Sequence, residues 1–166
     1  MASLVVAIIG RTKTGKTTLI ERLIKIFKEM GYRVGTVKHH RGNFDFDLEG
    51  KDSWRHRQAG ADVVVMSSPS QLAFIQKQQE DASLKEIQQM LGNKVDIILA
   101  EGFKNSFYPK IEVYRHKENE HDLLASRVEG VVGIVTDETI STDLPIFRWS
   151  EIDKLAEFLK GFLQQK

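Results

Sequence analysis

The sequence predicts an α/β fold of three layers, in which a mainly parallel sheet carries helices on both faces. Two observations point to this class. Continuous apolar runs, which suit strands covered on both sides, occur at residues 4–9, 95–100 and 131–135. Segments with helical spacing of apolar residues alternate with these runs. We therefore expect an open parallel sheet within a single domain over residues 1–166.

Four further segments have the pattern of strands. Residues 33–37, 62–66 and 72–75 are short and mostly apolar, which favours additional strands. Residues 110–114 alternate between charged and apolar side chains, and this pattern predicts a half-exposed or edge strand.

The helices are predicted from spacing and from their end signals. Apolar residues recur at helical spacing over residues 17–30, and Gly31 is suited to end that helix. Another helix begins at Ser83, where Glu86 three positions later gives the signature of a capping box. The last helix begins at Ser150 and carries an apolar stripe. The stripe consists of Ile152, Leu155, Ala156, Leu159 and Leu163.

Composition limits the classes of function. The 24 Lys and Arg residues against 23 Asp and Glu give a net charge of +1, so there is no global reason to expect binding to nucleic acid or to a membrane surface. Cysteine is absent, which excludes disulfides, thiol nucleophiles and thiolate metal sites. The run at residues 4–9 is far shorter than the ~20 residues of a membrane span and lacks the flanks of a signal peptide. We expect a soluble, cytoplasmic protein.

A glycine-rich stretch follows the first strand and matches the pattern GxxxxGK[ST] in full. Its residues are Gly10, Arg11, Thr12, Lys13, Thr14, Gly15, Lys16 and Thr17. This is the P-loop pattern, in which a curled backbone turns N–H groups inward around phosphate oxygens and the next helix adds its positive end. The motif predicts a three-layer P-loop NTPase fold and a nucleotide-binding site made of these eight residues.

Individual side chains of this stretch have separate expected roles. Lys16 is expected to reach the β- and γ-phosphates as a catalytic residue, and the Thr17 hydroxyl is a candidate ligand of Mg²⁺. Thr18 is a candidate partner of the α-phosphate. Arg11 and Lys13 either steer anions or point to solvent. The alternative for the whole stretch is a glycine-rich turn that only joins a strand to a helix.

A P-loop enzyme also needs a carboxylate near its metal ion. Asp96 lies near the start of the strand at residues 95–100 and Glu101 follows its end. Ligands bind at the carboxyl ends of parallel strands, and Asp96 is ~16 Å from that end, so we assign the role to Glu101. Glu101 is expected to act on Mg²⁺, directly or through water, or to orient an attacking water; the alternative is a solvated carboxylate. Gly102 would let the backbone approach a phosphate closely.

Residues 38–61 form a charged segment that begins at the end of a strand. Lys38 is expected to contact phosphate, and Asp47 is a weak candidate ligand of the metal ion. Residues 51–61 are expected to form a helix. We hypothesise that five basic residues bind a second anionic ligand or a partner protein. They are His39, His40, Arg41, Arg55 and Arg57. The alternative is a solvated loop packed by its aromatic side chains.

Three separated motifs together resemble the MobB family of molybdopterin-guanine dinucleotide biosynthesis adapter proteins. The motifs are GRTKTGKT, the segment from Thr36-Val37-Lys38-His39-His40 to Ala59-Gly60-Ala61, and Leu99-Ala100-Glu101-Gly102-Phe103-Lys104. They occur in the family's order and cover most of the chain, and Thr136-Asp137 is also in place. The resemblance implies a P-loop fold related to signal-recognition and metal-chaperone GTPases.

Function is implied by this resemblance and not by composition or spacing. It implies binding of GTP with Mg²⁺, at most weak GTP hydrolysis, and a homodimer. It also implies partnership with a MobA-type guanylyltransferase, which attaches GMP to the molybdenum cofactor; contact with molybdopterin itself is left open. Carried over by position, residues 10–17 would hold the nucleotide phosphates and Glu101 would be the acidic residue at the strand end.

Asp137 is the candidate residue for recognition of the base. The guanine-reading sequence Asn-Lys-x-Asp occurs at Asn93-Lys94-Val95-Asp96, but before a strand, at the wrong edge of the sheet to touch a base. Asp137 follows the strand at residues 131–135 and is better placed to accept from guanine N1 and N2. Its alternative role is that of a turn or N-cap aspartate.

A competing function is an ATP-dependent small-molecule kinase that uses the same P-loop. Kinases close an arginine-rich lid over the transferred phosphoryl group. Arg55 and Arg57 are such a pair, but no long helical lid is predicted. A third hypothesis is an interaction module that binds no nucleotide, but it leaves the glycine-rich stretch unexplained.

Overall fold

The computed structural model describes residues 3–40, 42, 44–45, 47–116 and 122–163. The chain forms two compact units. The first unit comprises residues 1–39 and 83–166, and the second unit comprises residues 40–82. The second unit is thus inserted into the sequence of the first, and a single domain over residues 1–166 stays a prediction.

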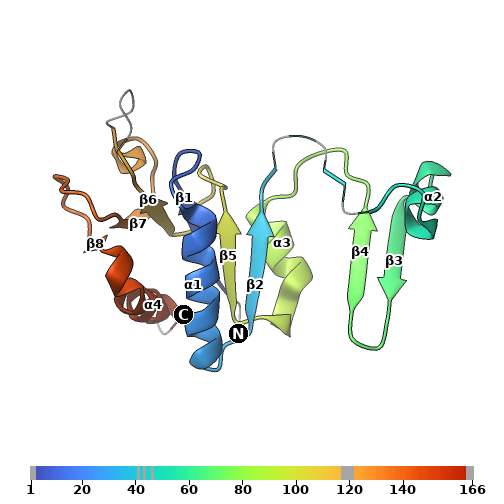
Figure 1. Ribbon diagram of the computed structural model, residues 1–166, viewed down its shortest axis with the longest axis horizontal. Helices are drawn as coiled ribbons and strands as arrows, with labels where there is room; N and C mark the ends of the chain where they lie inside the picture. Colours follow the sequence, from blue (N-terminus) through green and yellow to red (C-terminus); the bar gives the residue numbers. More distant parts are fainter. Residues whose placement is uncertain (1–2, 41, 43, 46, 117–121, 164–166) are drawn as a thin grey trace. The chain divides into compact units, whose positions relative to one another are not determined.

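The first unit is built on a six-stranded sheet in the order β2-β5-β1-β6-β7-β8, and every neighbouring pair in it is parallel (Figure 1). The strands are β1 (Leu4–Ile9), β2 (Val34–Lys38), β5 (Ile97–Glu101), β6 (Lys110–Val113), β7 (Val131–Val135) and β8 (Ile146–Phe147). The three apolar runs are β1, β5 and β7, as predicted, and β1 is buried along its whole length. β8 was not predicted from the sequence.

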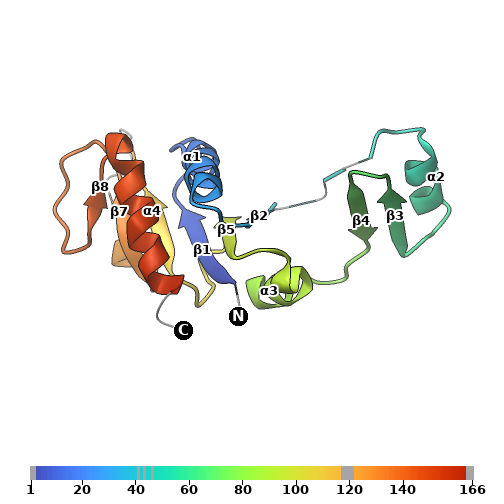
Figure 2. The ribbon, with the colours of Figure 1, turned by 90° about the horizontal axis from the view of Figure 1, so that it is seen from below.

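Helices cover both faces of this sheet, which confirms the three-layer α/β class. α1 (Lys16–Glu29) and α4 (Ile152–Lys160) lie on one face and α3 (Leu84–Leu91) on the other (Figure 2). Short 3₁₀ turns complete the unit: η1 (Gly92–Lys94), η2 (Leu124–Ser126), η3 (Trp149–Glu151) and η4 (Gly161–Leu163). Among the described residues, no helix has the length and apolar character that crossing a membrane requires.

The alternation of side chains along the strands divides the core in two. Leu99 of β5 points to the α1 and α4 side, where it packs with Leu23 of α1 and Leu155 of α4. Ile98 points to the opposite side, where it packs with Leu84 of α3. Since the strand period is two residues, Glu101 shares its parity with Leu99 and belongs to the face that α1 covers.

The helix ends follow the predicted signals. After α1, Gly31 takes a φ of 86° and its N–H bonds to the carbonyl of Lys28, while the N–H of Tyr32 bonds to the carbonyl of Phe27. The Phe27 and Tyr32 rings pack edge to face, so the end is a Schellman motif with its hydrophobic contact. At α3, Ser83 and Glu86 form the reciprocal capping box.

The prediction of an edge strand at residues 110–114 is wrong. β6 lies inside the sheet between β1 and β7, and its two charged side chains, Lys110 and Glu112, are buried. The Lys110 ammonium donates to the carbonyl oxygens of Ser106 and Tyr108, and the Glu112 carboxylate accepts from two N–H groups of η2. These backbone partners replace water, which is why an alternating strand tolerates the interior. Burial lowers the pKa of Lys110.

The second unit contains α2 (Asp52–Gln58) and an antiparallel hairpin of β3 (Val63–Ser67) and β4 (Leu72–Gln76). Strands were predicted at both hairpin positions, but they pair with each other and do not join the parallel sheet. α2 packs against β3 and is shorter than the predicted helix over residues 51–61.

Candidate functional site

The glycine-rich loop, residues 10–15, connects β1 to α1 in a curled conformation. Gly10, Lys13 and Gly15 have φ angles of 153°, 62° and 105°. A Cβ atom at Gly10 would lie 2.5 Å from the carbonyl oxygen of Val113, so only glycine fits where the loop passes the end of β6. Gly15 directly precedes α1, and a Cβ there would lie 3.0 Å from the Trp149 ring. The two glycines of the motif thus shape the loop at the amino end of α1.

A cavity of about 560 Å³ opens beside this loop. The loop and α1 contribute Lys13, Thr14, Gly15, Lys16, Thr17, Thr18 and Arg22. The sheet contributes Glu101, Arg115, Asp137 and Trp149, which lie at or just after the carboxyl ends of β5, β6, β7 and β8. Four strand ends and a helix amino end converge there, which is the place where parallel sheets bind ligands.

Hydrogen bonds from two side chains to one backbone carbonyl hold the loop together. The carbonyl oxygen of Arg11 accepts from the Lys16 ammonium at 2.7 Å and from the Thr14 hydroxyl at 3.0 Å. Both residues line the cavity, but Thr14 is almost fully buried, so its side chain mainly shapes the loop. The Arg11 guanidinium lies 3.4 Å from the carbonyl oxygen of Asp122. Of the predicted nucleotide-binding residues in this stretch, Gly10, Arg11 and Thr12 do not line the cavity.

Thr17 and Glu101, the two residues predicted to hold Mg²⁺, contact each other in the structure. The Thr17 hydroxyl donates to Glu101 Oε2 at 3.1 Å, and the Lys38 ammonium lies 3.7 Å from the same oxygen. A hydroxyl and a carboxylate are oxygen ligands of the kind Mg²⁺ prefers, and this ion commonly keeps water and phosphate oxygens as its other ligands. The donor set therefore fits Mg²⁺. Lys38 was expected to contact phosphate, and in the structure it pairs with Glu101.

Gly102 continues the pairing of β5 with β1. It has a φ of 99°, and its N–H donates to the carbonyl oxygen of Ile8 at 3.0 Å. Gly102 does not line the cavity, and a Cβ atom there would lie 3.4 Å from Cβ of His39. The glycine serves the turn that leaves the strand next to Glu101.

Asp137 and Trp149 form the far part of the cavity wall. Asp137 Oδ1 accepts from the N–H of Trp149 at 2.9 Å, so part of its carboxylate caps η3, and the residue also lines the cavity. Arg22 Nη1 donates to the carbonyl oxygen of Trp149 at 2.8 Å, and its guanidinium carbon lies 5.4 Å from the centroid of the indole ring.

Sequence reasoning missed Arg22, Arg115 and Trp149. Arg22 is four positions after Thr18 in α1, and residues at that spacing share a helix face. The other two follow carboxyl ends of strands, the same signal that identified Glu101 and Asp137. It was overlooked because β6 was expected at an edge and β8 was not predicted.

The five basic residues that were predicted to bind a second ligand or a partner protein do not all belong to one unit. His39 belongs to the first unit, where its N–H donates to the carbonyl oxygen of Glu101 and its ring packs on Phe103 at 5.2 Å. His40 belongs to the second unit, where Nδ1 lies 3.2 Å from the carbonyl oxygen of Gly42. Arg41 lies outside the described residues.

Charged residues of the second unit pair among themselves. Arg57 lies 2.9 Å from Asp45 and 3.5 Å from Asp47, and Arg55 lies 3.8 Å from Asp52. Asp47 also accepts from the Ser53 hydroxyl at 2.8 Å and is nearly buried. Asp47 therefore organises the start of α2, and its role as a metal ligand stays a prediction.

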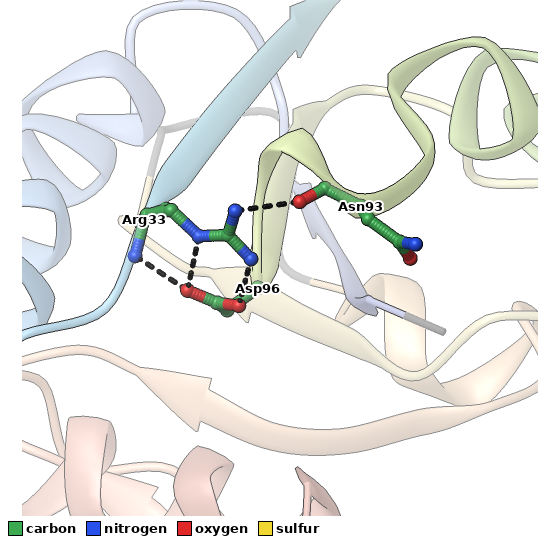
Figure 3. A network of polar contacts seen from close by, with 3 residues as sticks. All are labelled: Arg33, Asn93 and Asp96. Atoms are coloured by element: carbon green, nitrogen blue, oxygen red, sulfur yellow. Dashed lines mark hydrogen bonds and ion pairs between the residues drawn. The ribbon is translucent and has the colours of Figure 1, made fainter. Parts of the chain in front are cut away.

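The segment at residues 93–96, which has the sequence Asn-Lys-x-Asp, lies at the amino edge of the sheet, as predicted. Asp96 Oδ2 accepts from the Arg33 N–H at 2.8 Å and from Nε at 3.1 Å, and Oδ1 accepts from Nη2 at 2.7 Å (Figure 3). Arg33 Nη1 also donates to the carbonyl oxygen of Asn93 at 2.6 Å. These bonds from Arg33 hold the pKa of Asp96 at about 2. The aspartate ties the start of β5 to Arg33, the residue before β2.

Comparison with known proteins identifies relatives over nearly the whole chain. The family model "Molybdopterin guanine dinucleotide synthesis protein B", MobB, matches residues 5–137. The molybdopterin-guanine dinucleotide biosynthesis adapter protein of Haemophilus influenzae is 31% identical over 157 residues, which cover 94% of this chain and 87% of that protein. The protein of the same name from Escherichia coli is 31% identical over 161 residues, with 92% and 89% covered.

Solved structures agree with the fold. A crystal structure of molybdopterin-guanine biosynthesis protein B superposes with a TM-score of 0.77 at 31% identity, covering 97% of this chain and 99% of that one. The crystal structure of Bacillus subtilis MobB gives a TM-score of 0.74 at 30% identity, covering 95% and 96%.

Proposed function

Since the chain belongs to the MobB family, we propose that it is a GTP-binding adapter protein in molybdopterin guanine dinucleotide biosynthesis, with at most weak GTPase activity. The observation that carries the nucleotide assignment is the cavity at the carboxyl edge of the sheet. The curled glycine-rich loop and Lys16 line this cavity. The contacting pair Thr17 and Glu101, which can supply oxygen ligands to a metal ion, and Asp137 at another strand end line it as well.

The phosphates would bind at the glycine-rich loop. Its backbone and the amino end of α1 supply N–H donors, and Lys16 supplies positive charge next to them. The ammonium of Lys16 bonds to a backbone carbonyl of the loop in this structure. It would exchange that neutral partner for phosphate oxygens, which are stronger acceptors.

Thr17 and Glu101 would hold Mg²⁺ beside the phosphates. The bound ion would neutralise charge that develops on the phosphate oxygens. In hydrolysis a water oxygen bonds to the γ-phosphorus while the bond to the bridging oxygen breaks, giving GDP and phosphate. Glu101 would hold the ion or orient that water, and Lys16 would stabilise the leaving oxygen.

Asp137 would select guanine over adenine. Its carboxylate lines the cavity, and an acidic acceptor complements the N1–H and N2–H₂ donors of guanine. Adenine has no donor at N1 and would present an acceptor lone pair to the carboxylate there. The GTP preference therefore rests on this residue.

The proposed adapter role involves binding to another protein, outside the nucleotide cavity. The related proteins carry the word adapter in their names, which suits a chain that presents a bound nucleotide to another enzyme. We propose a cytoplasmic homodimer that assists a MobA-type guanylyltransferase. His39 in the first unit, and separately His40, Arg55 and Arg57 in the second unit, would contact that partner or an anionic ligand such as molybdopterin.

Calorimetric titration with GTP, GDP and ATP, each with and without Mg²⁺, tests the nucleotide assignment. We expect GTP binding in the micromolar range that strengthens with Mg²⁺ and exceeds ATP binding. A preference for ATP, with turnover that a small-molecule acceptor stimulates, would identify a kinase instead. Formation of molybdopterin guanine dinucleotide by a guanylyltransferase, with and without the chain, tests the adapter role.

A further inference from the structure

Trp149 is fixed in the cavity wall by three neighbours from different parts of the fold. Its backbone N–H donates to Asp137, its backbone carbonyl oxygen accepts from Arg22, and its ring edge lies beside Gly15 of the glycine-rich loop. The Arg22 guanidinium also lies over the indole ring. The two backbone bonds fix the position of the residue, and Gly15 and Arg22 beside the ring restrict the indole, so a ligand that packs on it loses little free energy to ordering the side chain.

The position of the indole suits the base of a nucleotide. Gly15 belongs to the phosphate end of the cavity, and Asp137 is the acceptor that would bind the base edge. The ring of Trp149 lies beside Gly15, its backbone N–H bonds to Asp137, and all three residues line the same cavity. Of the described residues that line the cavity, Trp149 is the one aromatic side chain. The other lining groups are polar, charged or glycine, and none of them presents a broad apolar surface.

We propose that the purine base of the bound nucleotide stacks on Trp149 while Asp137 accepts hydrogen bonds from its edge. This inference rests on the proposed nucleotide-binding function and names the residue that holds the base. Stacking is tolerant of base identity because every base has a π-face. Trp149 would thus supply affinity for purine nucleotides in general, and Asp137 would supply the preference for guanine.

Intrinsic fluorescence isolates the contact, because the chain has two tryptophans, Trp54 and Trp149. Trp54 belongs to the second unit and its replacement by Phe leaves Trp149 as the emitting residue. In this background we expect GTP to quench the emission, and inorganic tripolyphosphate, which has phosphates but no base, to leave it nearly unchanged. Equal quenching by both would overturn the proposal.

Two substitutions separate stacking from support of the loop. Trp149→Leu keeps an apolar contact with Gly15 but removes the π-face, and we expect it to weaken GTP binding about tenfold. Trp149→Phe keeps a smaller ring and should retain most of the affinity. Tripolyphosphate should bind both variants like the wild type. An unchanged GTP affinity in Trp149→Leu, or equal losses for GTP and tripolyphosphate, would contradict stacking.

The same titrations distinguish this proposal from the proposed function. If the wild type prefers ATP, the GTP assignment fails, but stacking still requires Trp149→Leu to weaken ATP about tenfold. If the wild type binds GTP and Trp149→Leu binds it equally well, the function stands and the stacking fails. Binding of neither nucleotide would overturn both.

Discussion

The two ends of strand β5 carry carboxylates with opposite surroundings. Asp96, just before the strand, accepts three hydrogen bonds from Arg33, and both of its oxygens are used. Glu101, at the last position, accepts from the Thr17 hydroxyl and has the Lys38 ammonium at 3.7 Å. The partners of Asp96 belong to the sheet and its connections, whereas Thr17 of the Glu101 pair lines an open cavity.

From this difference we infer that the start of the strand serves stability and its end serves ligand binding. A carboxylate satisfied by a planar guanidinium has little capacity left for another ligand. A carboxylate with a weak hydroxyl donor and a distant ammonium can exchange them for a metal ion or a bound water. We therefore expect changes at the carboxyl edge to alter binding and changes at the amino edge to alter stability.

The largest effect is expected at Lys16. Lys16→Ala removes the ammonium that would contact the terminal phosphates, and we predict that GTP binds about 100-fold more weakly while guanosine binding is unchanged. Calorimetry with both ligands measures the difference. The melting temperature should move by less than about 2 °C, because the Lys16 side chain lines the cavity and lies outside the hydrophobic core. Equal losses for GTP and guanosine would contradict the assigned contact.

The next effect is expected at Glu101. Glu101→Gln keeps an acceptor for the Thr17 hydroxyl but removes the charge, so Mg²⁺-dependent GTP hydrolysis should fall about 100-fold. Phosphate release at saturating GTP, measured across a Mg²⁺ series, tests this. Asp96→Asn is the matched control, since it removes one carboxylate from the other end of the same strand and should hydrolyse GTP normally. Normal turnover in Glu101→Gln would mean that another residue does this work.

Local patterns predicted most of the first unit. Continuous apolar runs identified β1, β5 and β7, and end signals at Gly31 and Ser83 located two helix boundaries, because these features depend on neighbouring residues only. β6 was misplaced because Lys110 and Glu112 find backbone partners outside the strand, which no local pattern reveals.

The cavity was predicted in part for the same reason. The glycine-rich motif and Glu101 follow from spacing and from the rule that ligands bind at strand ends. Trp149 depended on β8, a strand of two residues whose pairing with β7 is visible only in three dimensions. The grouping of residues 40–82 into a separate unit also has no local signal, since its strands have ordinary strand patterns.

A smaller effect, on stability, is expected at Asp96. Asp96→Asn weakens the pairing with Arg33 at an exposed position, so we predict a melting temperature lower by about 2–4 °C. GTP affinity should stay at the wild-type value. Differential scanning calorimetry measures the shift, and Asp143→Asn is the control, because Asp143 is also exposed and lies outside this network. A shift of the same size in the control would assign the effect to net charge.

The smallest effect is the pH dependence of that same pair. Asp96 has a pKa of about 2 in the folded chain against an ordinary value of 3.8, so folding favours its carboxylate form. The stability that it contributes is therefore fully present above pH ~5 and is lost as the pH falls from about 4 toward 2. Urea unfolding of the wild type and of Asp96→Asn should differ by a constant amount above pH ~5 and converge below it. A difference that persists undiminished at pH 2 would contradict the assignment, because the protonated aspartic acid and the asparagine of the variant would then be inequivalent for a reason other than charge.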